Sequence, residues 1–146
     1  MKKSLVCLGL VLLLVAAFAV AASAAAPKLA GNWYINGKRV VPSDQPGGFA
    51  QPLPPNMPLT IYTTDDPTLF YGTLVGPEGD QNFMTIMMDA GANMHFTVSR
   101  YAPNQTSGPL HTCTTGRGTA STTKINGLWS DDVGITGNFI MTRSPQ

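Results

Sequence analysis

Sulfur and imidazole side chains gather in one part of the sequence. The cluster contains Met84, Met87, Met88, Met94 and His95, and His111 and Cys113 follow further along the chain. Thioether, thiolate and imidazole are the ligands that select Cu(I). Alternate side chains of a β-strand face opposite ways, so Met94 and His95 should lie on opposite faces. This alternation favours methionines that fill a core over a copper site.

Other residue pairs could in principle carry out catalysis. His111 and Cys113 would share one face of an extended strand, as in a thiolate–imidazolium pair, but the sequence offers no third group to orient the imidazole. The pairs Asp65-Asp66 and Asp131-Asp132 could act as the two carboxylates of glycoside hydrolysis. Both occupy turn segments, where aspartate accepts hydrogen bonds from its own backbone. No phosphate-cradling loop or serine elbow is present, so we expect no enzyme and no cofactor.

Length and charge restrict the class of protein further. The chain has 146 residues, of which 43% are apolar and 12% charged, which is the size and composition of one domain. Without Lys2 and Lys3, seven basic residues stand against eight acidic ones, and no basic stripe is present. Nucleic acid is therefore not an expected partner.

The N-terminal residues have the pattern of a secretory signal peptide. Lys2 and Lys3 precede an uncharged run over residues 4–27 that ends in a series of alanines. We expect residues 1–24 to be removed, which leaves 25–146 as a single domain, secreted or periplasmic and free of the membrane. A retained membrane anchor is the alternative. Cys7 would leave with the leader, and the single remaining cysteine, Cys113, could form no intramolecular disulfide.

The remaining sequence contains short apolar segments separated by turn residues, and none has a sustained helical period. We expect strands at 31–35, 38–41, 59–63, 69–75, 83–88, 94–101, 119–130 and 135–143. Asn36-Gly37 is typical of a tight hairpin turn. Because nearly every connection is local, the pattern predicts an all-β fold, a small antiparallel meander β-barrel of about seven or eight strands.

Two long loops are expected in this barrel, at 42–58 and at 102–118. The first contains six prolines, which already fix the backbone, together with the apolar residues Phe49, Leu53 and Met57. These features predict a segment that docks over one mouth of the barrel.

Both ends of this domain resemble known barrel proteins. The segment Leu29-Ala30-Gly31-Asn32-Trp33-Tyr34 resembles the first-strand Gly-x-Trp signature of the calycin barrels, the lipocalin and avidin families. Residues 137–143 resemble the last strand of avidin-like proteins. The resemblance implies a small β-barrel in which Trp33 plugs one end and Arg143 packs across its indole.

The same comparison argues against biotin as the ligand. In avidins a ligand-binding asparagine directly follows the aromatic pair of the first strand, whereas Ile35 stands there in this chain and Asn36 comes one residue later. A shift of one residue turns a strand side chain to the opposite face. The resemblance therefore carries over the barrel and not biotin binding.

The function expected from these observations is non-catalytic binding of a small, largely apolar ligand in the lumen or at the rim of the barrel. The candidate lining residues are Tyr62, Tyr71, Phe96 and Trp129. A structural or protein-interaction domain, with a barrel filled by its own side chains, is the alternative, and soft-metal binding is the third interpretation. The sequence leaves the oligomeric state and the identity of the ligand open.

Overall fold

The computed structural model describes residues 27–40, 50–76 and 79–146. They form β1 (Gly31–Val40), β2 (Ala50–Pro52), β3 (Met57–Thr63), β4 (Leu69–Val75), β5 (Gln81–Met88), β6 (Asn93–Arg100), β7 (His111–Ala120), β8 (Lys124–Asp131) and β9 (Thr136–Thr142). No helix occurs within these ranges. The predicted leader, residues 1–24, lies outside the described residues.

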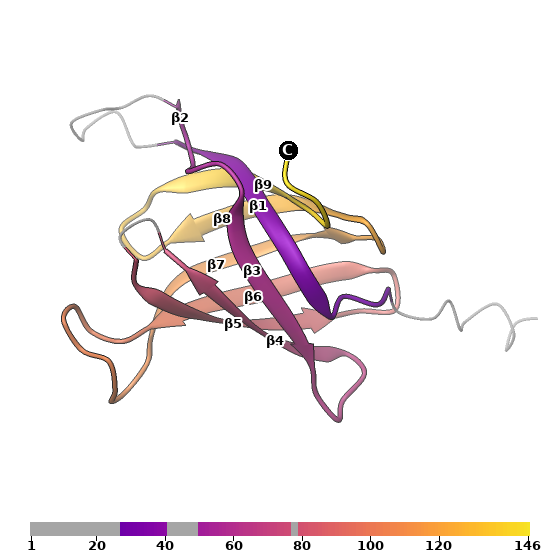
Figure 1. Cartoon of the computed structure of the whole chain (residues 1–146), viewed down its shortest axis with the longest axis horizontal. Helices are drawn as coiled ribbons and strands as arrows, with labels where there is room; N and C mark the ends of the chain where they lie inside the picture. Colours follow the sequence, from indigo (N-terminus) through magenta and orange to yellow (C-terminus); the bar gives the residue numbers. More distant parts are fainter. Residues whose placement is uncertain (1–26, 41–49, 77–78) are drawn as a thin grey trace, which may run out of the picture.

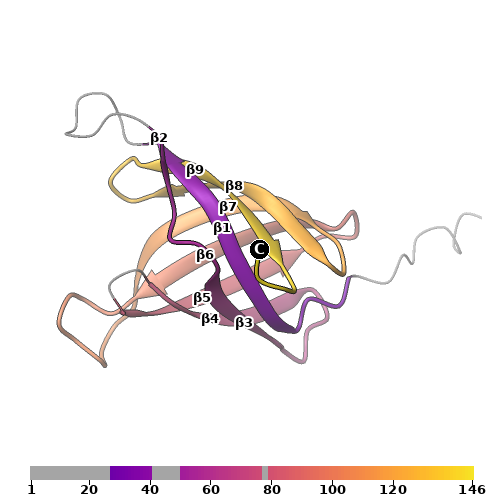
Figure 2. The same ribbon diagram turned by 45° about the horizontal axis from the view of Figure 1, so that its top comes forward.

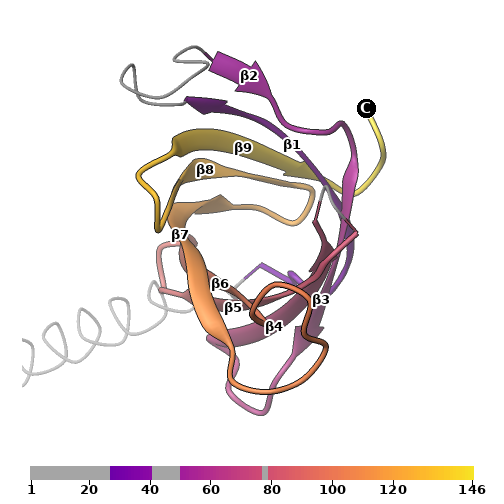
Figure 3. The same cartoon turned by 90° about the vertical axis from the view of Figure 1, so that its left-hand side faces the viewer.

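The strands close into a barrel (Figures 1 and 3). From β3 to β9, neighbouring strands in the sequence pair with each other antiparallel. β1 closes the ring by pairing with both β3 and β9. The short β2 pairs with the last residues of β1 and lies outside the closed ring of eight strands. The all-β meander barrel predicted from the sequence is confirmed.

Strand alternation places the core inside this barrel. On β5, Met84, Ile86 and Met88 are buried while Met87 is exposed, and on β6 Met94 is buried while His95 is exposed. The opposite facing of Met94 and His95 is thus confirmed. Other fully buried side chains line the barrel from the remaining strands, among them Trp33, Leu59, Ile61, Ile125 and Met141.

The predicted hairpin at Asn36-Gly37 is wrong. β1 continues straight through both residues, and Asn36 and Gly37 pair with Ile140 and Phe139 of β9. A Cβ at Gly37 would collide with the backbone carbonyl of Asn138, so glycine permits the close approach of two strands here. Figure 2 shows β1 running beside β9 along its length.

The predicted boundaries between 102 and 130 are also wrong. The second loop ends before His111, where β7 begins, and the predicted strand over 119–130 is divided by a turn. In this turn Ser121 Oγ donates to the Lys124 carbonyl and accepts from its N–H. The register of β7 against β6 shifts between Val98 and Ser99, which leaves Cys113 as the extra residue of a bulge.

The first long loop is described only from residue 50 onward, and Phe49 lies outside the described residues. Its described part is docked, because β2 pairs with β1 and Leu53 donates its N–H to the Gly37 carbonyl at 2.9 Å. Met57 packs against the core. The docking predicted for this part of the loop is therefore observed.

Candidate functional site

The barrel is closed at one end and hollow toward the other. Trp33 is fully buried at the closed end, where its Nε1 donates to the Leu29 carbonyl at 2.7 Å. A cavity of about 410 Å³ lies toward the opposite end, which Figure 3 views from outside. Trp33 does not line this cavity, whereas Leu53 and Met57 do. The docked loop thus contributes to the mouth of the lumen.

The wall of the lumen cavity is mainly apolar. Inward positions of successive strands supply Ile35, Leu74, Met84, Phe96, Val98, Trp129, Phe139 and Met141. Leu74 and Trp129 are only partly buried and pack against the core. The rings of Phe96 and Phe139 meet edge to face with centroids 5.4 Å apart. An apolar wall that meets polar side chains at its mouth is typical of small-molecule sites.

Two glycines make room for the aromatic rings of this wall. Gly116 pairs with Phe96 on one side and Trp129 on the other, and Trp129 in turn pairs with Gly137. A Cβ at Gly116 would collide with the Phe96 ring, and a Cβ at Gly137 would collide with the Trp129 indole. The glycines therefore let both rings lie flat against the sheet.

Trp129 carries an unused hydrogen-bond donor into this wall. Among the buried side-chain nitrogen and oxygen atoms of the described residues, only Trp129 Nε1 has no hydrogen-bond partner. A buried donor without an acceptor costs about 1–3 kcal/mol, so native proteins rarely retain one. Nε1 has almost no accessible surface and lies against Gly137, so an acceptor atom of a ligand reaches it only if the indole turns toward the cavity.

Polar side chains stand at the mouth of the cavity. Arg39 is positioned by β2, because its Nε donates to Gln51 Oε1 at 2.8 Å. Asn82 is buried and donates from Nδ2 to Asp80 Oδ2 at 2.8 Å. Asp131 Oδ1 accepts backbone hydrogen bonds from the turn that follows β8. The mouth thus presents guanidinium, amide and carboxylate groups above an apolar interior, and Arg100 and Asp132 also line it.

The predicted lining residues separate into two groups. Phe96 and Trp129 lie in the lumen cavity. Tyr62 and Tyr71 are 48% and 40% exposed on the outer wall and do not line this cavity. Alternation explains this, because Ile61 and Phe70 take the inward positions beside them.

Sequence reasoning missed other lining residues. Val98, Phe139 and Met141 share their strand face with Phe96 or with one another, so alternation alone could have found them. The predicted turn at 36–37 ended the first strand before Arg39, so Arg39 was not considered as a lining residue.

The residues that the sequence offered for catalysis do not come together in the structure. His111 is exposed, whereas Cys113 packs against the core and donates from Sγ to the Val98 carbonyl at 3.4 Å. Asp66 Oδ1 accepts from the backbone N–H and the hydroxyl of Thr68, which is turn chemistry. These hydrogen bonds hold the pKa of Asp66 below its ordinary value. Within the described ranges, no group of three or more His, Cys, Asp or Glu side chains could hold a metal ion.

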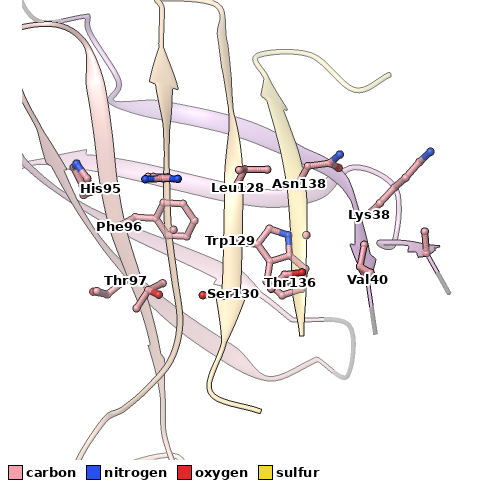
Figure 4. Close-up of a pocket in the computed structure, with 15 residues that line it drawn as sticks. Lys38, Val40, His95, Phe96, Thr97, Leu128, Trp129, Ser130, Thr136 and Asn138 are labelled. Carbon is pink, nitrogen blue, oxygen red and sulfur yellow. The ribbon is translucent and has the colours of Figure 1, made fainter. Parts of the chain in front are cut away.

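A second hollow of about 950 Å³ lies along the barrel wall formed by β6 to β9 and the end of β1 (Figure 4). In the figure, Phe96 and Trp129 lie between two rows of side chains. One row contains His95, Leu128, Asn138 and Lys38, and the other contains Thr97, Ser130, Thr136 and Val40. These rows occupy outward positions of their strands, and both aromatic rings belong to the lumen wall as well. We therefore take the lumen as the candidate site.

Comparison of the sequence with models of protein families, and with curated proteins, finds no match. In the described part of the chain, no helix is long and apolar enough to cross a membrane.

Proposed function

We propose that the protein is an exported, calycin-like barrel that binds a small, largely apolar molecule in its lumen. The observation that carries the proposal is the cavity of about 410 Å³ at the end opposite Trp33. Its size falls in the range of small-molecule sites, roughly 300–1,000 Å³. An eight-stranded barrel is just wide enough to hold one such ligand.

The lining indicates the chemistry of this ligand. An apolar body would replace water along the partly buried side chains of Leu53, Leu74 and Trp129, and a hydrogen-bond acceptor would pair with Trp129 Nε1 once the indole turns toward the cavity. The polar side chains at the mouth leave room for a polar group at the outer end of the molecule. We infer an amphipathic molecule with at least one carbonyl, ether or hydroxyl oxygen.

Export supports this proposal from the sequence side. The leader predicted over residues 1–24 would deliver the domain to the periplasm or the medium. The intact mass of the secreted protein tests this part, and we expect it to begin near residue 25. A full-length protein that requires detergent would contradict export without bearing on the lumen.

Two neighbouring residues of β4 provide the test of the lumen. Leu74 lines the cavity, whereas Val75 is 49% exposed on the outer wall. Leu74→Trp should fill the cavity, and Val75→Trp adds the same side chain outside it. The probe is N-phenyl-1-naphthylamine, whose fluorescence rises in an apolar environment.

We expect saturable binding of this probe to the parent protein and to Val75→Trp, and its loss in Leu74→Trp. Thermal unfolding of both variants shows whether each is folded. Equal binding by the two variants, or none by the parent protein, would reject the lumen as a binding site. A barrel filled by its own side chains would then be the better description.

A further inference from the structure

Four aromatic rings form a continuous row on the outer wall of the barrel. The aromatic row consists of Tyr62, Tyr71, Phe83 and Tyr101, on β3, β4, β5 and directly after β6. Successive ring centroids are 6.1, 6.4 and 5.6 Å apart. The planes of the first three rings differ by only 32° and 25°. Tyr62 and Tyr71 are exposed, whereas Phe83 and Tyr101 are half-buried and meet edge to face. Exposed side chains with this much apolar surface indicate a contact surface.

The wall around the aromatic row is uncharged and rich in hydroxyls. Tyr71 lies directly opposite Thr85, and Phe83 lies between Thr73 and Ser99. The outward positions of β3 to β6 contain no Lys, Arg, Asp or Glu in the described strands. Single-stranded nucleic acid, which also stacks on aromatic side chains, needs a cationic groove and is a poor fit to this wall.

One end of the aromatic row runs into a polar cleft. This cleft has a volume of about 640 Å³ and is lined by residues 79–81 and 100–106. Tyr101 forms part of its wall, so the row and the cleft are continuous. The lining contributes the side-chain amides of Gln81, Asn104 and Gln105 together with the charged groups of Asp80 and Arg100. We refer to it as the amide cleft.

We propose that the aromatic row and the amide cleft together bind a neutral oligosaccharide of β-1,4-linked hexopyranose units. The C–H groups on the flat faces of such sugars suit the electron-rich faces of aromatic rings. Their hydroxyls can pair with the threonine hydroxyls of the wall and with the amides of the cleft. The ring spacing is comparable to the length of one hexopyranose unit, so an extended chain can contact successive rings.

Other occupants fit these features less well. An apolar protein surface would cover the rings but leave the hydroxyls and amides without partners, which is unfavourable. A second copy of the chain would have to bring two curved barrel walls together along the row, and the sedimentation measurement below distinguishes it from a sugar. The combination of rings, hydroxyls and amides therefore favours a carbohydrate.

The test uses the mature protein with cellohexaose and chitohexaose as probes, in calorimetric titrations. We expect saturable binding of at least one probe, weakened by about tenfold or more in Tyr71→Ala. Gln105→Ala, in the amide cleft, should also weaken it. Ile140→Ala is the matched control, because Ile140 is 38% exposed and points outward on β9, away from the row. It should bind as the parent protein does.

Two further variants separate binding at the aromatic row from loss of the fold and from binding in the lumen. Tyr71→Phe retains the ring and should keep most of the affinity, which separates loss of the ring from loss of the fold. Leu74→Trp, on the inner face of β4, should leave the dependence of sugar binding on Tyr71 unchanged, although the amide cleft and the lumen mouth share Asp80 and Arg100.

The proposal is overturned if neither sugar binds, or if Tyr71→Ala and Ile140→Ala behave alike. It is also overturned if sedimentation shows a dimer that Tyr71→Ala dissociates while no sugar binds, since the row would then be a self-association surface.

Discussion

The guanidinium of Arg143 lies over the indole of Trp33, with Cζ 3.9 Å from the ring centroid. Its Nη1 and Nη2 donate to the carbonyls of Ala30 and Lys28 at 2.9 and 2.7 Å, and its Nε donates to Thr122 at 3.2 Å. Burial lowers the pKa of Arg143 from its ordinary value, yet an arginine side chain stays protonated in proteins. Arg143 therefore joins the segment before β1 to the turn before β8 and covers the closed end of the barrel.

Replacing either partner of this contact should destabilise the barrel. We expect Trp33→Ala to lower the free energy of unfolding by about 3–5 kcal/mol, because the indole is fully buried. Arg143→Lys should cost about 1–3 kcal/mol, since a lysine ammonium cannot reach three carbonyls and stack at once. Urea unfolding measures both values. A Trp33→Ala protein as stable as the parent would contradict the role of Trp33 as a plug.

The unpaired donor of Trp129 leads to a prediction about ligand preference. Trp129→Phe keeps a ring in the lumen wall and removes the N–H. Binding of 6-propionyl-2-dimethylaminonaphthalene, which carries a ketone, should weaken by about five- to tenfold. Binding of N-phenyl-1-naphthylamine, which has no carbonyl, should change much less. Thermal stability should be unchanged or higher, because a buried donor without an acceptor is lost. Equal weakening of both probes would show that the indole acts only by its shape.

The docked loop should control access to the lumen. Leu53 lines the cavity and is fixed to β1 through its backbone N–H. Leu53→Ser should weaken binding of N-phenyl-1-naphthylamine by about tenfold, because apolar lining is lost, and leave the barrel folded. Leu110→Ser is the control, since Leu110 is exposed and lies outside the cavity. Similar affinities for the two variants would argue against a role for the loop in binding.

Acid should remove part of the stability supplied by the turn between β5 and β6. The side-chain amide of Asn93 and the backbone N–H groups of Asn93 and Gly91 hold the pKa of Asp89 below its ordinary value. A carboxyl with a lowered pKa in the folded state stabilises above its unfolded pKa, and this contribution disappears as the pH falls through the folded value. The melting temperature of Asp89→Ala should therefore lie below that of the parent protein at neutral pH. The difference should shrink below about pH 4. A difference independent of pH would show that the charge of Asp89 is not involved.

Local patterns were enough to predict most of the strands and the class of fold. The strand predicted at 69–75 agrees with β4, and the alternation around Met94 gave the correct faces for both neighbours. A period of two residues is a property of the extended backbone itself, so it can be seen without knowledge of the partner strands. Trp33 was likewise assigned to the closed end of a barrel from its motif alone.

The predictions that failed depended on contacts between distant segments. Asn36-Gly37 has the composition of a turn, but pairing with Ile140 and Phe139 keeps it extended, because a long antiparallel partner satisfies more backbone groups than a local turn can. The sequence thus determined that the chain alternates buried and exposed residues in short strands. Only the closed barrel decided which face of each strand is inside. It turned Tyr71 to the outer wall and Trp129 to the lumen, because closure gives the two sides of the same sheet different environments.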